Sequence, residues 1–283
     1  MQDSIRKADI LIEALPYLQA FRGKVIVAKY GGSAIDHPTA MQGMLQDLIF
    51  LSTVGIRPVL VHGGGPMITR QLEQKGRSTT FIDGMRVTDR HTIQVVHREL
   101  SKVNHRLVTH VKALGGRAEG IAPPREVVVA APHPRSSELG FVGSVCAIHT
   151  GPIRLMFLRH VIPVISPVGV GDDGQLYNIN ADDVASNVAA YLRAEKFVLL
   201  TNVRGILRRA DDPASLIPTV SAKQATRLME RRIIQSGMIP KVKACMHALR
   251  RGVKKTHIID ATIPHALLLE IFTKRGIGTE IVR

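Results

Sequence analysis

Short apolar runs alternate with helical patterns along most of this chain, and each run ends where glycine or polar residues begin. The runs cover residues 25–28, 57–61, 161–166, 197–200, 256–259 and 279–282. Apolar residues at helical spacing fall between them, at residues 38–54, 67–75, 89–114, 152–159, 182–193, 221–235, 238–249 and 264–272. Residues 117–148 alternate apolar and polar positions around several prolines and predict further strands or hairpins. The pattern predicts an α/β fold with an open, mostly parallel central sheet sandwiched between helices.

The composition is typical of a globular protein that buries a large core. Of the 283 residues, 45% are apolar and 22% are charged. No apolar run approaches the roughly 20 residues needed to span a bilayer, and charged residues interrupt the apolar patch at the N-terminus, which argues against a signal peptide. The two cysteines, Cys146 and Cys245, are far apart in the sequence. We therefore expect buried free thiols in a reducing compartment.

The net charge of +15 admits nucleic acid, an anionic membrane surface or anionic small molecules as partners. The basic residues are dispersed along the chain, and no nucleic-acid-binding motif is present. Aromatic residues are scarce and tryptophan is absent, which argues against a platform for stacking single-stranded bases. A basic surface that attracts anionic substrates is favoured, and specific nucleic-acid binding remains the weaker alternative.

Two glycine-rich turns follow predicted strands. Lys29 and the pair Gly31-Gly32 come directly after the first apolar run, so an ammonium and free backbone N–H groups reach the edge of the sheet where ligands bind. His62-Gly63-Gly64-Gly65-Pro66 links the second strand to a helix and forms a second candidate anion cradle. It matches neither the dinucleotide nor the P-loop pattern. A plain structural turn is the alternative at both places.

Polar residues at three later junctions suit the same chemistry. Arg86 precedes the long helix and has the geometry to grip a carboxylate, although a surface arginine is the alternative. Asn178 and Asn180 lie on one face of an extended segment, and Asp182 follows at a helix start, where plain capping is the alternative. Lys241 lies in the first helical turn after Pro240, a place where a cation favours a bound anion.

Six motifs occur together in this chain: YGGS, HGGGP, GMRVTD, GQLYNINAD, LTNVRGI and GMIPKVKAC. Their order and spacing resemble the amino acid kinase family over about residues 20–283. Within that family they are most similar to the branch that phosphorylates N-acetyl-L-glutamate in arginine biosynthesis. The segments ALPYLQAFRGK and PHALLLEIFTKRGIGTEIV resemble its arginine-inhibited, hexameric members.

The resemblance implies transfer of a phosphoryl group from MgATP to the side-chain carboxylate of N-acetylglutamate, giving an acyl phosphate. That carboxylate is already ionised at pH 7, so the reaction needs alignment and charge neutralisation rather than a general base. By resemblance, Lys29 and Lys241 stabilise the transferring phosphoryl group from either side, and Asp182 holds both lysines in place.

The resemblance also assigns binding roles. The implied substrate-binding residues are Gly64, Gly65, Arg86, Asn178 and Asn180. The implied nucleotide-binding residues are Gly31, Gly32, Thr201, Asn202, Val203, Gly205, Ile206, Leu207 and Gly237. No protein metal site is implied, because Mg²⁺ would be held mainly by the ATP phosphates.

Three segments follow from the same comparison. Residues 1–20 form a helix that we expect to be kinked at Pro16 and to serve oligomerisation, with docking on its own subunit as the alternative. Residues 21–194 form an acyl-amino-acid-binding lobe, and residues 195–283 a nucleotide-binding lobe. An allosteric arginine site is implied at Tyr17, Lys196, His265, Glu270, Gly276 and Gly278; an exposed helix charge is the alternative for Glu270. A cytoplasmic homo-oligomer, a hexamer built from dimers, is expected.

Three departures from the family pattern leave the acceptor open. A Gly-Lys-Asp-Gly type of loop is usual soon after the strand at residues 118–121, where this chain reads APPREVVVAAP. Asn202 replaces the usual aspartate, and His105 the usual lysine after Val103-Asn104. Acetylaminoadipate, carbamate or UMP are alternative acceptors, and a non-catalytic arginine sensor is an alternative of another class.

Overall fold

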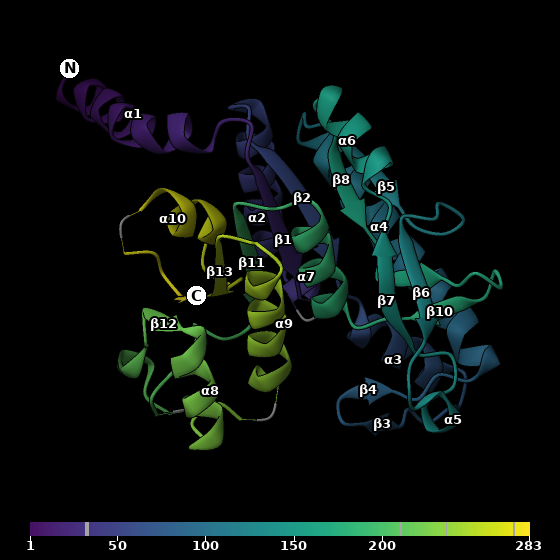
Figure 1. Ribbon diagram of the computed structural model, residues 1–283. Coiled ribbons are helices and arrows are strands. Elements are labelled where there is room, and N and C mark those ends of the chain that lie inside the picture. The colour runs from purple at the N-terminus through teal and green to yellow at the C-terminus, as the bar shows by residue number, and fades with distance from the viewer. Residues whose placement is uncertain (32–33, 210, 236, 274) are drawn as a thin grey trace.

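The central element of the structure is a twisted sheet that runs through the whole molecule (Figure 1). The computed structural model describes residues 1–31, 34–209, 211–235, 237–273 and 275–283. Within them, the main sheet has eight strands in the order β12 (Thr219–Ser221), β14 (Thr279–Val282), β13 (Lys255–Asp260), β11 (Lys196–Thr201), β1 (Val25–Tyr30), β2 (Arg57–His62), β8 (Ile162–Ile165) and β5 (Ala118–Ile121). The strands from β13 to β5 are parallel, and β14 joins β13 in the antiparallel direction. The predicted open, mostly parallel sheet is confirmed.

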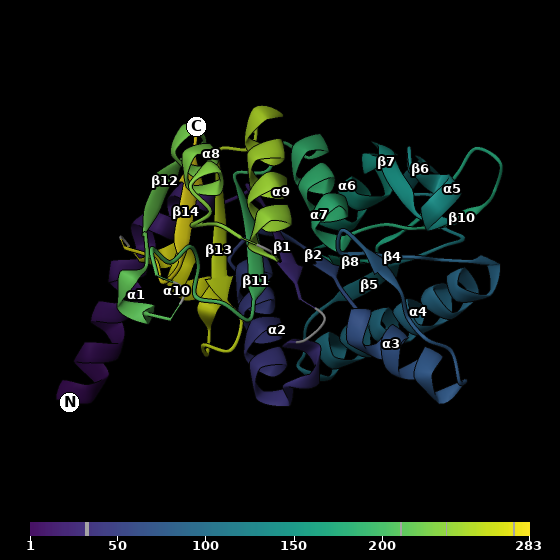
Figure 2. The ribbon, with the colours of Figure 1, turned by 90° about the horizontal axis from the view of Figure 1, so that it is seen from below.

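Helices cover both faces of this sheet (Figure 2). Ile26 and Ala28 of β1 pack into one core cluster with α2 (Pro38–Thr53), α4 (Arg90–Ala113) and α10 (Ala266–Phe272). Val27, which points the other way, packs into a second cluster with α6 (Thr150–Leu158), α7 (Ala181–Tyr191), α8 (Ala222–Glu230) and α9 (Met238–Arg250). Successive strand residues face opposite sides, so a continuous apolar run is what a strand buried on both faces requires.

A smaller sheet lies beside the carboxyl edge of β2. Its strand order is β10 (Leu176–Asn178), β9 (Val168–Val170), β6 (Val128–Pro132) and β7 (Gly143–Ile148). Near it lie the hairpin β3 (Phe81–Ile82) and β4 (Met85–Arg86), and the helices α3 (Gly65–Gln74) and α5 (Ser136–Leu139). Two short 3₁₀ helices complete the elements, η1 (Ala34–Asp36) and η2 (Pro213–Ser215). The strands expected within residues 117–148 are confirmed as β5, β6 and β7.

Local signals explain where several elements begin and end. Asp89 caps α4, because its side chain accepts a hydrogen bond from the Thr92 N–H at 2.6 Å. The helix expected over residues 221–235 ends earlier, at Glu230, since the backbone of Arg232 is left-handed with φ of 56°. The helix expected from residue 264 begins at Ala266, because His265 is also left-handed, with φ of 54°.

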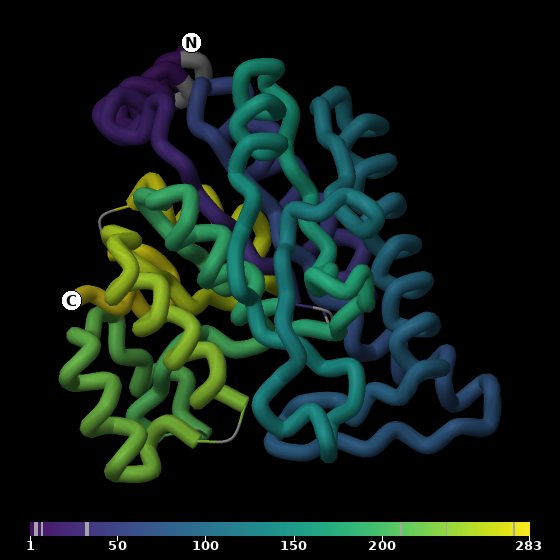
Figure 3. Tube along the Cα trace, turned by 45° about the vertical axis from the view of Figure 1, so that its right-hand side comes forward, coloured from purple at the N-terminus to yellow at the C-terminus, as the bar shows by residue number. Residues whose placement is uncertain are grey.

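The helix α1 (Gln2–Phe21) projects from the body of the molecule and reaches it near α10 (Figures 1 and 3). Tyr17 packs edge-on against Phe272 with the ring centroids 6.1 Å apart. The side chains of Leu11 and Ile12, by contrast, are 66% and 67% exposed. Pro16 lies inside the helix, and the kink expected there stays a prediction. Most of the apolar surface of α1 is uncovered in the single chain.

The fold shows where the two cysteines lie. Both cysteines are free thiols, and Cys245 is buried, but Cys146 is exposed on β7. The expectation of two buried thiols is therefore wrong for Cys146, because that position on the small sheet faces away from the core. In the described parts of the chain, no helix has the length and apolar character needed to cross a membrane.

Candidate active site

A cavity of about 400 Å³ lies at the carboxyl edge of β1 and β2, between the main sheet and the smaller one. Parallel strands of an open α/β sheet bind their ligands at this edge. Eight residues predicted from the sequence line the cavity together: Lys29, Gly64, Gly65, Arg86, Asn178, Asn180, Asp182 and Lys241. They come from β1, β4, the end of β10 and the starts of α3, α7 and α9. The fold therefore brings together residues that are up to 212 positions apart in the chain.

Asp182 binds the two lysines at the base of this cavity. The Lys29 Nζ atom lies 2.8 Å from Asp182 Oδ1, and the Lys241 Nζ atom lies 3.2 Å from Asp182 Oδ2. Asp182 sits in the first turn of α7, where the helix dipole also favours a negative charge. One carboxylate thus holds two ammonium groups side by side, and both face the cavity.

The two lysine charges change the pKa of Asp182. Burial alone would raise the pKa of Asp182, but the nearby Lys29 and Lys241 charges lower it below its ordinary value. The carboxylate is therefore ionised at neutral pH, and the three groups together carry one net positive charge. Such a cluster favours an anionic ligand in the adjoining space.

The second glycine turn forms one wall of the cavity. Gly64 is the residue before α3, and a Cβ atom at this position would lie 2.5 Å from Leu100 Cδ2. A side chain at Gly64 would therefore have to displace Leu100 of α4, and its absence leaves the backbone of the turn beside the ligand space. The prediction that this turn is more than a connection is supported by its place in the cavity wall.

Arg86 is buried and held from one side. Its Nη2 atom donates to Thr69 Oγ1 at 2.8 Å and to the Gly65 carbonyl at 3.1 Å. Its guanidinium lies 4.8 Å from the ring centroid of Phe81. The Nη1 atom is buried and has no partner among the described residues. Because Arg86 lines the cavity, this free donor is suited to a carboxylate of a bound molecule, and the surface-arginine alternative is wrong.

The two asparagines differ in how much of the side chain remains free. Asn178 donates from Nδ2 to Thr88 Oγ1 at 3.1 Å, which leaves its amide oxygen as an acceptor. Asn180 caps α7, since its Oδ1 atom accepts a hydrogen bond from the Asp182 N–H at 2.7 Å. The capping alternative is therefore correct for Asn180, and its cap fixes the helix turn that carries Asp182.

Of the predicted nucleotide residues, Gly31 and the loop from Thr201 to Leu207 lie at or after the ends of β1 and β11, and Gly237 precedes α9. The Gly31 N–H donates to the Leu200 carbonyl at 3.0 Å, which places the first glycine turn beside the end of β11. The loop after β11 is fixed by Thr201 Oγ1, which accepts from the Val203 N–H at 3.1 Å, and by the Ile206 N–H, which donates to Thr279 Oγ1 at 2.8 Å. Gly32 lies outside the described residues. The nucleotide-binding roles of all nine predicted residues stay predictions.

Some cavity residues had no recognisable signal in the sequence. His133, Ser144 and Asp183 also line the cavity. His133 directly follows the segment of residues 122–132 that departs from the family pattern, and Ser144 lies on β7. Asp183 follows Asp182, and desolvation in the cavity wall, with the negative charge of Asp182, raises its pKa to about 6. Within the described residues, no group of three or more His, Cys, Asp or Glu side chains is arranged to hold a metal ion.

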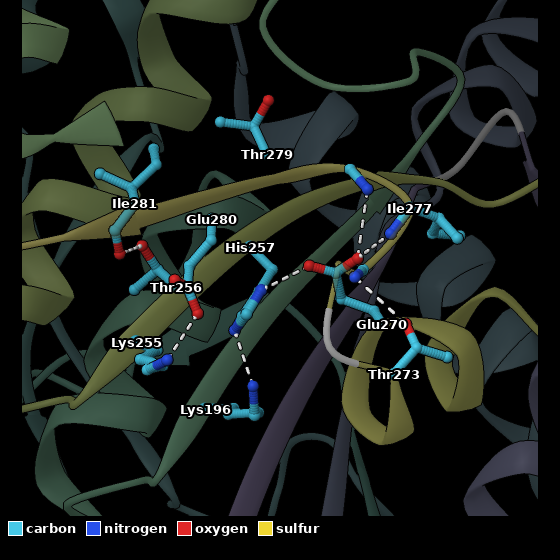
Figure 4. A network of polar contacts seen from close by, with 12 residues as sticks. Lys196, Lys255, Thr256, His257, Glu270, Thr273, Ile277, Thr279, Glu280 and Ile281 are labelled. Atoms are coloured by element: carbon cyan, nitrogen blue, oxygen red, sulfur yellow. Dashed lines mark hydrogen bonds and ion pairs between the residues drawn. The ribbon is translucent and has the colours of Figure 1, made fainter. Parts of the chain in front are cut away.

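A second polar cluster joins β11, β13 and α10 at some of the predicted effector residues (Figure 4). Lys196 Nζ lies 3.2 Å from His257 Nε2, and His257 Nδ1 lies 2.6 Å from Glu270 Oε1. The other oxygen of Glu270 accepts from the N–H groups of Ile277 at 2.7 Å and Gly278 at 3.1 Å. Glu270 is only 5% exposed, so the alternative of an exposed helix charge is wrong.

The remaining predicted effector residues surround this cluster unevenly. A Cβ atom on Gly276, whose φ is 62°, would lie 2.6 Å from Glu270 Oε2. Lys196 lies 5.5 Å from the ring centroid of Phe21, the last residue of α1. His265 points elsewhere, since its Nδ1 atom lies 2.6 Å from Asp47 Oδ1 on α2. Burial lowers the pKa of Lys196 and of His257 and so disfavours their charged forms. Burial would raise the pKa of Glu270, but His257 and two backbone N–H groups lower it and favour the carboxylate.

Comparison with known proteins connects the cavity to a family. The model of the amino acid kinase family matches residues 24–260. An acetylglutamate kinase of Desulforamulus reducens is 45% identical over 285 residues, covering 100% of this chain and 99% of the relative. An acetylglutamate kinase of Synechococcus elongatus is 47% identical over 275 residues, covering 96% of this chain and 91% of the relative.

Solved structures of N-acetylglutamate synthase from Neisseria gonorrhoeae are also similar. The complex with coenzyme A and N-acetyl-glutamate has a TM-score of 0.86 and 28% identity, covering 96% of this chain. The complex with coenzyme A and L-arginine has a TM-score of 0.82 and 26% identity, covering 95% of this chain. This chain spans 62% and 64% of those synthase chains.

The Asp182 ion pairs yield a stability prediction. Replacing Asp182 by Asn leaves two lysine charges without their carboxylate, so we expect the free energy of unfolding at pH 7 to fall by about 3 kcal/mol. Urea unfolding measures this loss. The double variant Lys29→Met/Asp182→Asn, which removes one of the two charges, should recover part of it. The folded pKa of Asp182 is lowered, so the difference between wild type and variant is present above the unfolded pKa and disappears as acid protonates the folded carboxylate. Equal stability at pH 7 would contradict the prediction.

Proposed function

This chain belongs to the amino acid kinase family, and we propose that it transfers the γ-phosphoryl group of ATP to the side-chain carboxylate of N-acetyl-L-glutamate. The products are N-acetylglutamyl 5-phosphate and ADP. A carboxylate oxygen attacks the γ-phosphorus, the bond from that phosphorus to the β–γ bridging oxygen breaks, and no proton moves. The full-length similarity to acetylglutamate kinases supports this acceptor. The reaction is a step toward arginine, and we place it in the cytoplasm with its substrates.

The arrangement of Lys29, Asp182 and Lys241 is the observation that carries the proposal. Phosphoryl transfer between two anions needs positioning and neutralisation of charge more than covalent chemistry. The two ammonium groups are held on one carboxylate at 2.8 and 3.2 Å, so they are already in place before the reactants bind. Preorganised charges of this kind stabilise the transition state because they need no rearrangement during the reaction.

The rest of the cavity is suited to the acceptor. The free Nη1 donor of Arg86 is available to the α-carboxylate, and the free amide oxygen of Asn178 is available to the acetamido N–H. The turn at Gly64 and Gly65 brings backbone N–H groups to the reacting end. In this proposal ATP lies over the ends of β1 and β11, near residues 201–207 and Gly237. Magnesium enters with the ATP phosphates and neutralises their charge.

The Lys29→Ala variant tests the reaction. We expect kcat to fall by about 10²–10³, because one preorganised charge at the phosphoryl group is lost, while the fold is kept. The measurement traps the acyl phosphate with hydroxylamine and quantifies the hydroxamate. Lys243→Ala is the matched control, since Lys243 is an exposed lysine on the same helix as Lys241, and its activity should equal that of the wild type.

A panel of acceptors identifies the substrate, with ADP release measured beside hydroxamate formation because phosphorylated UMP gives no hydroxamate. N-acetylglutamate should give the highest kcat/KM, ahead of acetylaminoadipate, with carbamate and UMP inactive. No ATP-dependent hydroxamate with any N-acylated acidic amino acid would refute the kinase proposal. A preference for acetylaminoadipate would keep the reaction and change the acceptor. Residues 122–132, which depart from the family pattern and precede His133, would then be the first candidates for the cause of that preference.

We propose further that arginine acts as an effector at the cluster around Glu270. The complex of the similar synthase with L-arginine supports this choice of ligand. The cluster joins α10, the segment of residues 276–278 and the end of α1, and it holds a buried carboxylate that suits a guanidinium. In the free chain that carboxylate is occupied by His257 and two backbone N–H groups. Arginine would therefore replace the contact with His257.

The variant Glu270→Gln tests the effector site. We expect the arginine concentration for half-inhibition to rise at least about tenfold, in line with the loss of a charge-assisted hydrogen bond, and the activity without arginine to persist. Glu280→Gln is the control, because Glu280 pairs with exposed Lys255 at 2.9 Å on the neighbouring strand. A wild-type kinase that arginine does not inhibit would reject the proposal, and arginine binding without any phosphoryl transfer would favour the sensor alternative.

We also propose that α1 serves the assembly of dimers into a hexamer. Its exposed apolar side chains include Ile5, Ile10, Leu11 and Ile12, and a contiguous apolar face on a projecting helix favours a protein partner. A second copy of the chain satisfies this need without another component.

Deletion of residues 1–20 tests the assembly. We expect the mass measured by light scattering to fall from about six subunits to two, while the kinase activity of each subunit is retained because α1 does not line the active-site cavity. The double variant Leu11→Ser/Ile12→Ser should give the same change without shortening the chain. An unchanged mass in both variants would mean that α1 docks only on its own subunit.

A further inference from the structure

His62 is a fully buried polar residue that the mechanism above does not use. It is the last residue of β2, directly before the glycine turn, and its exposed fraction is 0%. Its Nδ1 atom lies 2.9 Å from the Gly63 carbonyl oxygen, and its Nε2 atom lies 3.2 Å from Asn104 Nδ2. Every polar atom of the ring therefore has a partner, and the partners connect it to the cavity wall.

These partners define which ring nitrogen carries the proton. A carbonyl oxygen only accepts hydrogen bonds, so Nδ1 must donate to Gly63. Asn104 Nδ2 also donates to the Val164 carbonyl at 2.8 Å, which identifies this end of the amide as its NH₂ group. Nε2 is thus the acceptor in a neutral ring. Burial lowers the pKa of His62 to about 4, which agrees with a neutral ring at pH 7.

The orientation of the Gly63 carbonyl decides the direction of the next N–H group. In a planar trans peptide, the C=O and the N–H point in opposite directions. Because the Gly63 carbonyl turns toward the buried His62 ring, the Gly64 N–H turns away from it. Gly64 lines the active-site cavity, and its N–H has no acceptor within the parts of the chain that the structure describes.

We propose that His62 is a positioning residue for phosphoryl transfer: its Nδ1–H holds the Gly63 carbonyl so that the Gly64 N–H donates to an oxygen of the reacting carboxylate or phosphoryl group. This inference rests on the proposed kinase function. Without the bond from His62, the peptide is free to rotate, because glycine on both sides imposes little restraint. In part of the molecules, the Gly64 N–H would then point away from the reacting carboxylate or phosphoryl group.

Asn104 and Gly120 complete the chain of contacts. Asn104 on α4 reaches His62 only because Gly120 on β5 has no side chain: a Cβ atom there would overlap Asn104 Oδ1. Gly120 pairs with Val164, whose carbonyl also holds Asn104. The orientation of a cavity-wall peptide is thus set by residues from β2, α4, β5 and β8. Gly63 and Gly64, at the end of this chain of contacts, line the ligand space.

Two kinetic variants and one spectroscopic measurement test the proposal. His62→Asn places an amide NH₂ near the position of Nδ1–H, whereas His62→Leu fills the site without a donor. We expect His62→Leu to lower kcat at least about tenfold, part of the 10²–10³ that loss of such a donor costs, with a smaller change in KM for the acceptor. His62→Asn should keep kcat within about threefold of the wild type. Gly120→Ala should resemble His62→Leu.

Nitrogen NMR of the histidine-labelled wild-type kinase reads the tautomer directly, and His62→Asn assigns the signal. A proton on Nδ1 supports the proposal, and a proton on Nε2 overturns it. Unchanged kcat in His62→Leu, or equal impairment of the Asn and Leu variants, also overturns it. If His62→Leu does not fold, His62→Asn and the tautomer decide. A wild type that forms no acyl phosphate would refute the kinase function instead, and the tautomer would still decide whether His62 holds the Gly63 carbonyl.

Discussion

The contact of Asp182 with Lys29 and Lys241 is the interaction on which the site depends. A buried carboxylate without partners, or two facing lysines without a carboxylate, would each be unfavourable. Together they satisfy one another and leave one net positive charge at the cavity. The sheet supplies Lys29 from β1, α9 supplies Lys241, and the Asn180 cap fixes the turn that carries Asp182. Strand order, helix packing and capping together thus set the distances between the side chains of Lys29, Asp182 and Lys241.

The main sheet and most of its helices could be predicted because their sequence patterns are strong. A parallel strand buried on both faces needs a continuous apolar run, as in residues 25–28. The polar residue Asp89, which caps α4, marks the start of that helix in the sequence. The wrongly predicted helix boundaries lie where the φ angle of one residue ends or delays the helix. The left-handed residues Arg232 and His265 ended or delayed helices that apolar spacing had extended. Such angles depend on tertiary packing, and spacing does not report them.

Only part of the candidate site could be predicted from the sequence. Residues within recognisable motifs, such as Lys29, Arg86 and Lys241, do meet at one cavity. Ser144 on β7 and His133 just after β6 were missed because the place of the smaller sheet beside the cavity depends on long-range contacts. His62 was visible only as the first letter of a glycine motif. Its importance appears when the positions of Asn104 and Gly63 are known, because a tautomer is defined by partners rather than by sequence.

The distance in sequence between the two lysines has a consequence for synthesis of the protein. Lys29 belongs to the first strand, whereas Lys241 lies on α9, close to the end of a chain of 283 residues. Until α9 has left the ribosome and packed, Asp182 has only one of its two partners. A nascent chain that has not yet reached α9 therefore has no complete catalytic centre.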